Sequence, residues 1–384
     1  MNKKLYTATL ISILFLHSFG QDSTKTINTT LEYKGQLSSW AHLNLDNAYP
    51  LYAGARYIPQ LNYEVQITKQ KLIDFETSAN LYGDVGFQFF DSLKTNGDIK
   101  PYRIWGRYSG KQFEIRAGLQ KINFGPAKMM RALRWFDRLD PRDPLQITDG
   151  VYGLLTRYYF LNNTNIWAWG LYGNNTTKGM EILPTHKEIP EFGGRLQTPI
   201  PAGEAAISYH HRTATTEAPL SALYPFEKIP ENRIGLDTKL DVIVGLWFEA
   251  SWTTKSENIE MLTNQEMISV GSDYTFGIAN GLNISVEHLL FSSDKSAFAF
   301  ENTQNFTALS ANYAFGLFDT VNTIFYYNWN TENMYSFINW FKQFNKTSLY
   351  IMGYWNPENP QPITGNSMNL YSGKGLQIMF VYNH

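Results

Sequence analysis

The stretch TTLEYKGQLSSWAHLNL at residues 29–45 decides the fold of this chain. Its odd-numbered positions are apolar or small, whereas most even-numbered positions are charged or polar, as at Glu32 and Lys34. Because successive side chains of a strand point to opposite faces, the stretch predicts a strand with one apolar face. The alternation recurs near residues 56–67, 72–89, 113–119, 205–212 and 282–287. Such rows are typical of an all-β transmembrane barrel with antiparallel, up-and-down strands.

The composition agrees with a barrel and excludes several other classes. Aromatic residues make up 15% of the chain and charged residues only 17%, below the roughly 25% of soluble domains. The net charge of −2 gives no indication of nucleic-acid binding. The absence of cysteine excludes a disulfide scaffold. We therefore expect contacts with outer-membrane lipid and lipopolysaccharide, and no cofactor.

The first 20 residues have the pattern of a cleaved secretory signal peptide. Lys3 and Lys4 precede an apolar run at residues 10–16, and small residues follow at 18–20. Residues 21–384 are then expected to form a single barrel domain, carried across the inner membrane and inserted into the outer membrane.

Short and long connections alternate between the predicted strands. Short ones fall near residues 68–71, 109–111, 161–164 and 200–203, and longer ones fall between them. Bacterial barrels have short periplasmic turns, long external loops and an even strand number. We predict about 18 strands, with 16 as the alternative because the strands near 334–342 and 347–355 are weak.

Residues 124–149 interrupt the alternation and form the predicted third external loop. Pro126 suits the start of a helix and Pro141 its end. The pattern predicts a helix with a basic stripe, followed by a charged turn. We expect a constriction folded into the lumen; the alternative is a surface helix whose cations pair with neighbouring aspartates. The candidate constriction residues are Lys128, Arg131, Arg134, Arg138, Asp137, Asp140, Arg142 and Asp143.

Charged residues on the inward rows give a second set of candidates. If the faces are assigned correctly, one side of the pore is acidic and the other basic, and such a field would favour anionic or dipolar solutes. The alternative is that these charges pair and fill the interior. The candidate pore-lining residues are Glu32, Glu64, Asp74, Glu76 and Asp84 on the acidic side, and Arg103, Arg107, Arg116, Arg157, Arg195 and Arg212 on the basic side.

These features together resemble the Gram-negative porins. The stretch RAGLQKINFG at residues 116–125 is similar to the R-x-G-x-Q-x-x-x-x-G strand of substrate-selective porin-like families. The resemblance implies passive diffusion of small polar solutes, an inserted third loop, and assembly as a homotrimer.

Two other classes of outer-membrane protein, a hydrolase and a polysaccharide-binding barrel, are alternatives to a porin. An outer-membrane hydrolase is disfavoured because the chain lacks Gly-x-Ser-x-Gly, and His210 and His211 point to opposite faces of a strand. No catalytic residue and no metal site is predicted. A non-conducting barrel that binds or helps to export a surface polysaccharide is the main alternative. External aromatic residues would then stack on sugars, and conductance would distinguish the two classes. These residues are Trp329, Tyr335, Trp340, Tyr354 and Trp355.

Overall fold

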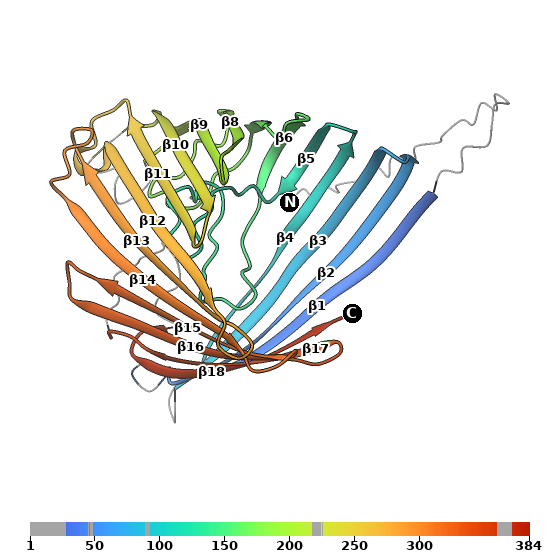
Figure 1. The fold of residues 1–384 in the computed structure, drawn as a ribbon, viewed down its shortest axis with the longest axis vertical. Coiled ribbons are helices and arrows are strands. Elements are labelled where there is room, and N and C mark those ends of the chain that lie inside the picture. The colour runs from blue at the N-terminus through green and yellow to red at the C-terminus, as the bar shows by residue number, and fades with distance from the viewer. Residues whose placement is uncertain are drawn as a thin grey trace, which may run out of the picture.

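The computed structural model describes residues 28–44, 46, 49–88, 93–216, 224, 226–358 and 371–384. These residues form 18 antiparallel strands in one sheet that closes on itself, because β1 pairs with both β2 and β18 (Figure 1). Each other strand pairs with its neighbours in sequence. The predicted fold is confirmed. The predicted signal peptide lies outside the described residues.

The four N-terminal strands are the longest, with 17 or 18 residues each. Their bounds are β1 Asn28–Asn44, β2 Leu51–Thr68, β3 Lys71–Phe87, β4 Leu93–Ser109, β5 Phe113–Gln120, β6 Val151–Tyr159, β7 Asn165–Leu171, β8 Glu191–Ile200 and β9 Gly203–Ala214. The second half comprises β10 Ile229–Asp241, β11 Gly245–Lys255, β12 Asn264–Phe276, β13 Leu282–Asp294, β14 Thr303–Ala314, β15 Asp319–Asn328, β16 Asn333–Gln343, β17 Thr347–Trp355 and β18 Lys374–Asn383.

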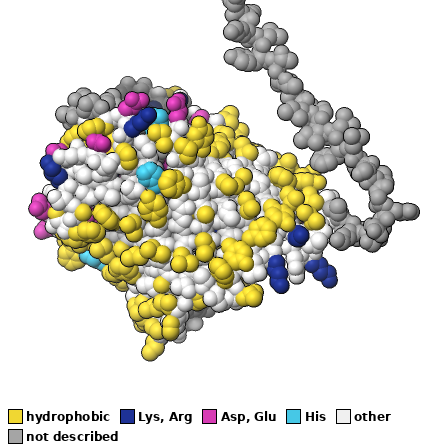
Figure 2. Space-filling view, turned by 90° about the horizontal axis from the view of Figure 1, so that it is seen from above, with side chains coloured by type: hydrophobic (Ala, Val, Ile, Leu, Met, Phe, Trp, Pro, Cys, Tyr) yellow, Lys and Arg dark blue, Asp and Glu magenta, His cyan; other side chains and the backbone are white. Residues whose placement is uncertain are grey.

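The two faces of β1 divide as its sequence predicts. Leu31 and Tyr33 are exposed on the outer surface, whereas Ser38 and His42 are buried inside. Figure 2 shows hydrophobic side chains spread over the visible outer surface, with charged side chains gathered toward its edges. An apolar outer surface is what lipid requires of a transmembrane barrel.

The predicted alternation of connections is also confirmed. At one rim, eight short connections of two to five residues join consecutive strands, such as that between Thr68 and Lys71, and most connections at the other rim are longer. The two weak strands are present as β16 and β17. Among the described residues, the only helical element is the 3-10 helix η1, Glu260–Leu262, and no helix is long and apolar enough to span a membrane.

Candidate functional site in the lumen

The connection between β5 and β6, which we call loop 3 (residues 121–150), folds into the barrel. Ala132, Leu133, Trp135 and Phe136 are all buried, although they belong to a connection rather than to the wall. The predicted inward fold is therefore confirmed. Figure 1 shows this loop as the trace that crosses the interior after β5.

The predicted helix in this loop is wrong. Residues 121–150 contain turns and bends but no helical segment. In a helix, the N–H of Leu133 would donate to the carbonyl of Met129. Instead, it donates to the carboxylate of Glu249, which is a stronger acceptor than a neutral carbonyl.

Two glutamates of the wall hold the loop. Glu287 of β13 accepts the backbone N–H groups of Lys128 at 2.6 Å, Met129 at 2.9 Å and Met130 at 2.5 Å. Its Oε1 also accepts the indole N–H of Trp247 at 3.1 Å. Both carboxylates are completely buried, and the N–H groups that converge on them offset part of the cost of burying them.

Glu249 of β11 forms the second attachment. It accepts the N–H of Ala127 at 2.8 Å and that of Leu133 at 3.1 Å. Close by, the indole of Trp135 donates to Ser251 at 2.9 Å. The segment from Ala127 to Trp135 is thus fixed to β11 and β13 by hydrogen bonds to its backbone as well as its side chains.

Apolar contacts reinforce this attachment on two sides. Met129, Met130 and Ala132 pack against a buried apolar cluster that covers the inner face of β12 to β17. We call this surface the apolar wall; it comprises Met267, Leu289, Phe306, Ala308, Ile324, Tyr326, Tyr335, Phe337, Met352 and Tyr354. Leu133, Trp135 and Phe136 pack in a second cluster with Phe124, Leu155 and Trp169.

The predicted constriction cations all have partners in or near loop 3. Arg131 pairs with Asp137 at 2.9 Å, and Arg142 pairs with Asp140 while its guanidinium lies 5.4 Å from the Phe337 ring. Lys128 reaches Asp273 of β12, and Arg138 donates to the carbonyl of Thr177 at 2.6 Å. The pairing that the surface-helix alternative invoked is therefore present, but inside the barrel.

Arg134 differs from the other cations of the loop. Its Nη1 donates to the carbonyl of Leu139 at 3.3 Å and its Nη2 contacts the sulfur of Met180, while its Nε has no hydrogen-bond partner. Burial lowers the pKa of Arg134 to about 10. Burial likewise raises the pKa of Asp143, although the backbone N–H groups of Leu145 and Ile147 oppose that shift.

Three of the predicted pore-lining arginines, Arg107, Arg116 and Arg157, lie together on the inner face of β4 to β6, which we call the charged wall. Arg107 pairs with Asp74 at 2.8 Å and with Glu114 at 3.3 Å. Glu114 also pairs with Arg116 at 3.0 Å and Arg157 at 3.7 Å. These side chains stay partly exposed, with Arg107 at 26%, so water reaches them within the lumen.

The acidic candidates do not face the basic ones across the lumen. Asp74 contacts Arg107 directly, and Glu76 lies close enough to Arg103 for their charges to interact. The remaining three are Glu32, paired with Lys34 at 2.9 Å; Glu64, opposite Asp74 in the sheet; and Asp84, which accepts from Asn96 at 3.3 Å. Of the five acidic candidates, Asp74 and Glu76 thus neighbour the basic ones, at the boundary between β3 and β4.

Arg195 and Arg212 are buried rather than lining open space. Arg195 pairs with Asp237 at 2.6 Å. Arg212 is 1% exposed and pairs with Glu231 at 2.6 Å. Arg103 is also buried, and donates to the carbonyl of Thr148 in loop 3 at 2.9 Å.

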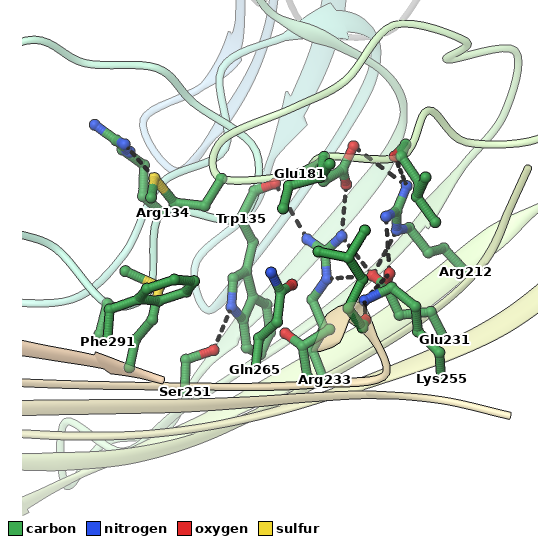
Figure 3. Close-up of a pocket in the computed structure, with 17 residues that line it drawn as sticks. Arg134, Trp135, Glu181, Arg212, Glu231, Arg233, Ser251, Lys255, Gln265 and Phe291 are labelled. Atoms are coloured by element: carbon green, nitrogen blue, oxygen red, sulfur yellow. Dashed lines mark hydrogen bonds and ion pairs between the residues drawn. The ribbon is translucent and has the colours of Figure 1, made fainter. Parts of the chain in front are cut away.

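The Arg212 ion pair belongs to a larger buried network beneath the connection between β7 and β8 (loop 4, residues 172–190). Figure 3 shows Arg212 and Arg233 directed toward Glu231 and Glu181, around a cavity of about 30 Å³. Glu181 of loop 4 pairs with Arg233 at 2.7 Å and Arg212 at 3.3 Å. Burial alone would raise the pKa of Glu181, but the surrounding cations lower it below its ordinary value.

Sequence reasoning missed the attachment sites and the inward course of loop 4. Glu287 was recognised only as an inward residue of its strand, and Glu249 was not singled out. The available signal is a glutamate in the middle of a lumen-facing row between apolar neighbours, as in Trp247-Phe-Glu249.

The aromatic residues proposed to stack on sugars do not form one surface: Tyr335 and Tyr354 are buried in the apolar wall, whereas Trp329 and Trp355 are exposed.

Comparison with known proteins identifies the fold. No protein-family model matches the sequence, and no curated protein matches it. OccAB4 of Acinetobacter baumannii superposes with a TM-score of 0.56 at 8% identity, over 92% of this chain and 98% of that chain. OmpT of Vibrio cholerae, described as a trimer form, gives 0.53 at 10% identity over 93% and 99%. OmpF of Salmonella typhi, in a complex with daunomycin, gives 0.51 at 11% identity over 92% and 97%.

The chain therefore has the closed-barrel fold of the outer-membrane porins. At 8–11% identity, the likeness to these proteins shows the fold alone. What the barrel conducts or binds must be argued from its own lumen.

Proposed function

We propose that this protein is an outer-membrane channel through which small polar solutes diffuse passively, with loop 3 as its constriction. The observation that carries the proposal is the attachment of loop 3 inside the barrel by Glu249 and Glu287. A fixed loop narrows the path of a solute and keeps the exposed side chain of Lys128 beside it. A loop that served only as an external cover would not need buried carboxylate acceptors in the wall.

The accessible charges favour anionic or dipolar solutes. On the charged wall, Arg107, Arg116 and Arg157 share Glu114 and Asp74, so cations outnumber anions in that group. Lys128 of loop 3 also remains exposed to solvent. A surplus of cations beside acidic partners attracts anions and orients dipoles, while it raises the cost of passing a cation or an apolar solute.

Reconstitution of the full chain in a planar lipid bilayer tests the proposal. We expect discrete conductance steps and, in a salt gradient, a reversal potential that reports anion preference. The Arg131→Ala and Arg134→Ala variants should shift that potential toward cations. Absence of conductance steps would overturn the proposal that the protein is a channel. A cation-selective potential unchanged in both variants would overturn only the role of loop 3 in selectivity.

The second candidate is a non-conducting barrel that binds or helps to export a surface polysaccharide. The observation that favours it is the extent to which loops 3 and 4 fill the interior, where most residues of 129–137 are buried. The bilayer measurement separates the two, because a barrel filled for binding gives no steps.

We also propose that the protein assembles as a homotrimer in the outer membrane. The support is the apolar outer surface together with the likeness to OmpT of Vibrio cholerae, whose structure is described as a trimer. Chemical cross-linking of the full chain in detergent should stop at a trimer. A cross-linked ladder that stops at the monomer would contradict it.

A further inference from the structure

Loop 3 encloses a small cavity of its own. The cavity has a volume of about 40 Å³, and each described residue that lines it belongs to loop 3. These residues are Lys128, Met129, Arg131, Arg134, Leu139, Pro141 and Gln146. Three of them are cations and none is acidic, so the lining offers positive charge and hydrogen-bond donors to whatever enters the cavity.

Arg134 lies deepest among these cations, with 5% of its surface exposed. Its Nη1 donates to the carbonyl of Leu139 at 3.3 Å and its Nη2 contacts the sulfur of Met180. Its Nε is buried and has no hydrogen-bond partner. Figure 3 shows its guanidinium directed away from the ion pairs of Glu181 and Glu231. Arg134 is therefore a buried cation whose described contacts are a neutral carbonyl and a thioether.

An arginine in this position needs a counter-ion. Although burial lowers its pKa to about 10, Arg134 stays protonated at neutral pH. A charge that is removed from water is costly unless an opposite charge lies next to it and its hydrogen bonds are satisfied. An anion in the cavity would supply the opposite charge together with an acceptor for Nε.

The carboxylates of this region already bind other donors. Those of Asp137 and Asp273 pair with the other two cations of the lining, Arg131 and Lys128. The others pair with different cations or accept backbone N–H groups; they are Asp140, Asp143, Asp149, Glu249 and Glu287. Two of these carboxylates attract Arg134 through space without an ion pair. Counted pair by pair, the lining keeps one positive charge, that of Arg134, without a direct partner.

The cavity is accessible and its size limits what can enter. At its entrance Gln146 is exposed and the side chain of Lys128 is 47% exposed, whereas the side chain of Arg131 is only 9% exposed. A cavity of roughly 10–15 Å³ holds one water molecule, which fills about 30 Å³ in the liquid. The observed 40 Å³ thus admits a monatomic anion, while an organic acid is too large.

We propose that this cavity binds one small inorganic anion, of the size of chloride, as the counter-ion of Arg134. The guanidinium groups of Arg131 and Arg134 face the ion from inside, and Lys128 and Gln146 lie on the side of the solvent. The bound ion would stabilise loop 3 in its attached conformation. This inference rests on the charges within loop 3 and does not depend on whether the barrel conducts.

Thermal unfolding of the full chain in detergent tests the proposal. Sodium chloride is compared with sodium gluconate at equal ionic strength, so that screening is the same and the anions differ in size. An anion that binds only the folded chain raises the unfolding temperature as its concentration increases. The test variant is Arg134→Met. The matched control is Arg195→Met, because Arg195 is also 5% exposed but has Asp237 as its counter-ion.

We expect the unaltered chain to unfold at a higher temperature in chloride than in gluconate. Arg195→Met should unfold earlier in both salts but keep the increase caused by chloride, whereas Arg134→Met should lose that increase. Lys128→Ala should raise the chloride concentration that gives a set increase by up to about fivefold, the effect of one nearby unit charge. Equal unfolding temperatures of the unaltered chain in both salts, or an increase that persists in Arg134→Met, would overturn the proposal.

Bromide provides a second measurement that does not depend on the folding of a variant. Crystals of the unaltered chain soaked in sodium bromide should give an anomalous scattering peak between the guanidinium groups of Arg131 and Arg134. Anomalous peaks confined to the outer surface, with only water in the cavity, would contradict the proposal.

Discussion

The charged wall and the apolar wall enclose the same lumen but are built for different tasks. On the charged wall, Arg107, Arg116 and Arg157 converge on Glu114 and remain reachable by water. On the apolar wall, Met129 and Met130 of loop 3 are packed among buried aromatic and aliphatic side chains. In the proposed channel, the charged wall would present charge to a solute, whereas the apolar wall holds loop 3.

The two walls differ in how much they contribute to the free energy that holds loop 3 in place. Ion pairs that are partly exposed contribute about 0–1 kcal/mol each, so the charged wall can do little to hold loop 3. Burying a large apolar side chain is worth about 1.5–3 kcal/mol, and satisfying buried N–H groups avoids a penalty of about 1–3 kcal/mol each. Loop position should thus depend on the apolar side, and ion selectivity on the charged side.

The largest effect is expected from Glu287→Leu. This change leaves the N–H groups of Lys128, Met129 and Met130 without their acceptor, at about 1–3 kcal/mol for each buried group. We expect loop 3 to leave the wall, with a higher and noisier single-channel conductance and trypsin cleavage after Arg131. Glu204→Leu is the control, because the side chain of Glu204 is exposed and accepts a hydrogen bond from the side chain of Gln197 rather than from loop 3. Unchanged conductance and protease resistance would show that the carboxylate does not hold the loop.

A smaller effect, which is a loss of stability, is expected from Phe306→Ala in the apolar wall. Phe306 is 4% exposed, and truncation of a buried phenylalanine costs about 3–5 kcal/mol of stability. The unfolding transition of the barrel in detergent should move to lower temperature, while the reversal potential stays unchanged. Phe315→Ala is the matched control, because Phe315 is exposed on the outer surface. A changed reversal potential in Phe306→Ala would show that the apolar wall also affects ion selectivity.

The sequence was sufficient to predict the barrel and its strand number, because a period of two with one apolar face has few other interpretations. The break at residues 124–149 also marked the loop that enters the lumen. The spacing of Lys128, Arg131 and Arg134 nevertheless gave a helix that does not exist. That spacing carries no information on Glu249 and Glu287, which lie more than 100 residues away in sequence and compete for the backbone N–H groups of the loop.

The predicted roles of Arg195 and Arg212 differ from the structure for a related reason. Alternation placed Arg195 and Arg212 correctly on the inner face, but a face is not the same as a pore lining. Glu181 of loop 4 completes the ion pairs of Arg212 and Arg233, and the ring of Phe124 in loop 3 lies 5.0 Å from the guanidinium of Arg195. A single sequence predicts the direction of each side chain along a strand, whereas it does not predict which connection will fold over it.

A moderate change in selectivity is expected from Glu114→Gln on the charged wall. The substitution removes the shared partner of Arg107, Arg116 and Arg157. One unit charge about 4 Å away changes the energy of an ion in water by about 1 kcal/mol. The ratio of anion to cation permeability should therefore rise up to about fivefold at low salt, less at high salt. The same change in Glu204→Gln, or none in Glu114→Gln, would contradict a specific role for this wall.

The smallest effect is expected from Lys128→Ala, even though Lys128 is a predicted constriction residue. Its side chain is 47% exposed and its ion pair with Asp273 should contribute less than about 1 kcal/mol. Its backbone N–H, which the substitution keeps, donates to Glu287. Protease resistance of loop 3 should therefore match that of the unaltered chain, while the reversal potential shifts slightly toward cations. Release of the loop by Lys128→Ala would mean that side-chain charge, rather than the backbone contacts to the wall, holds the constriction in place.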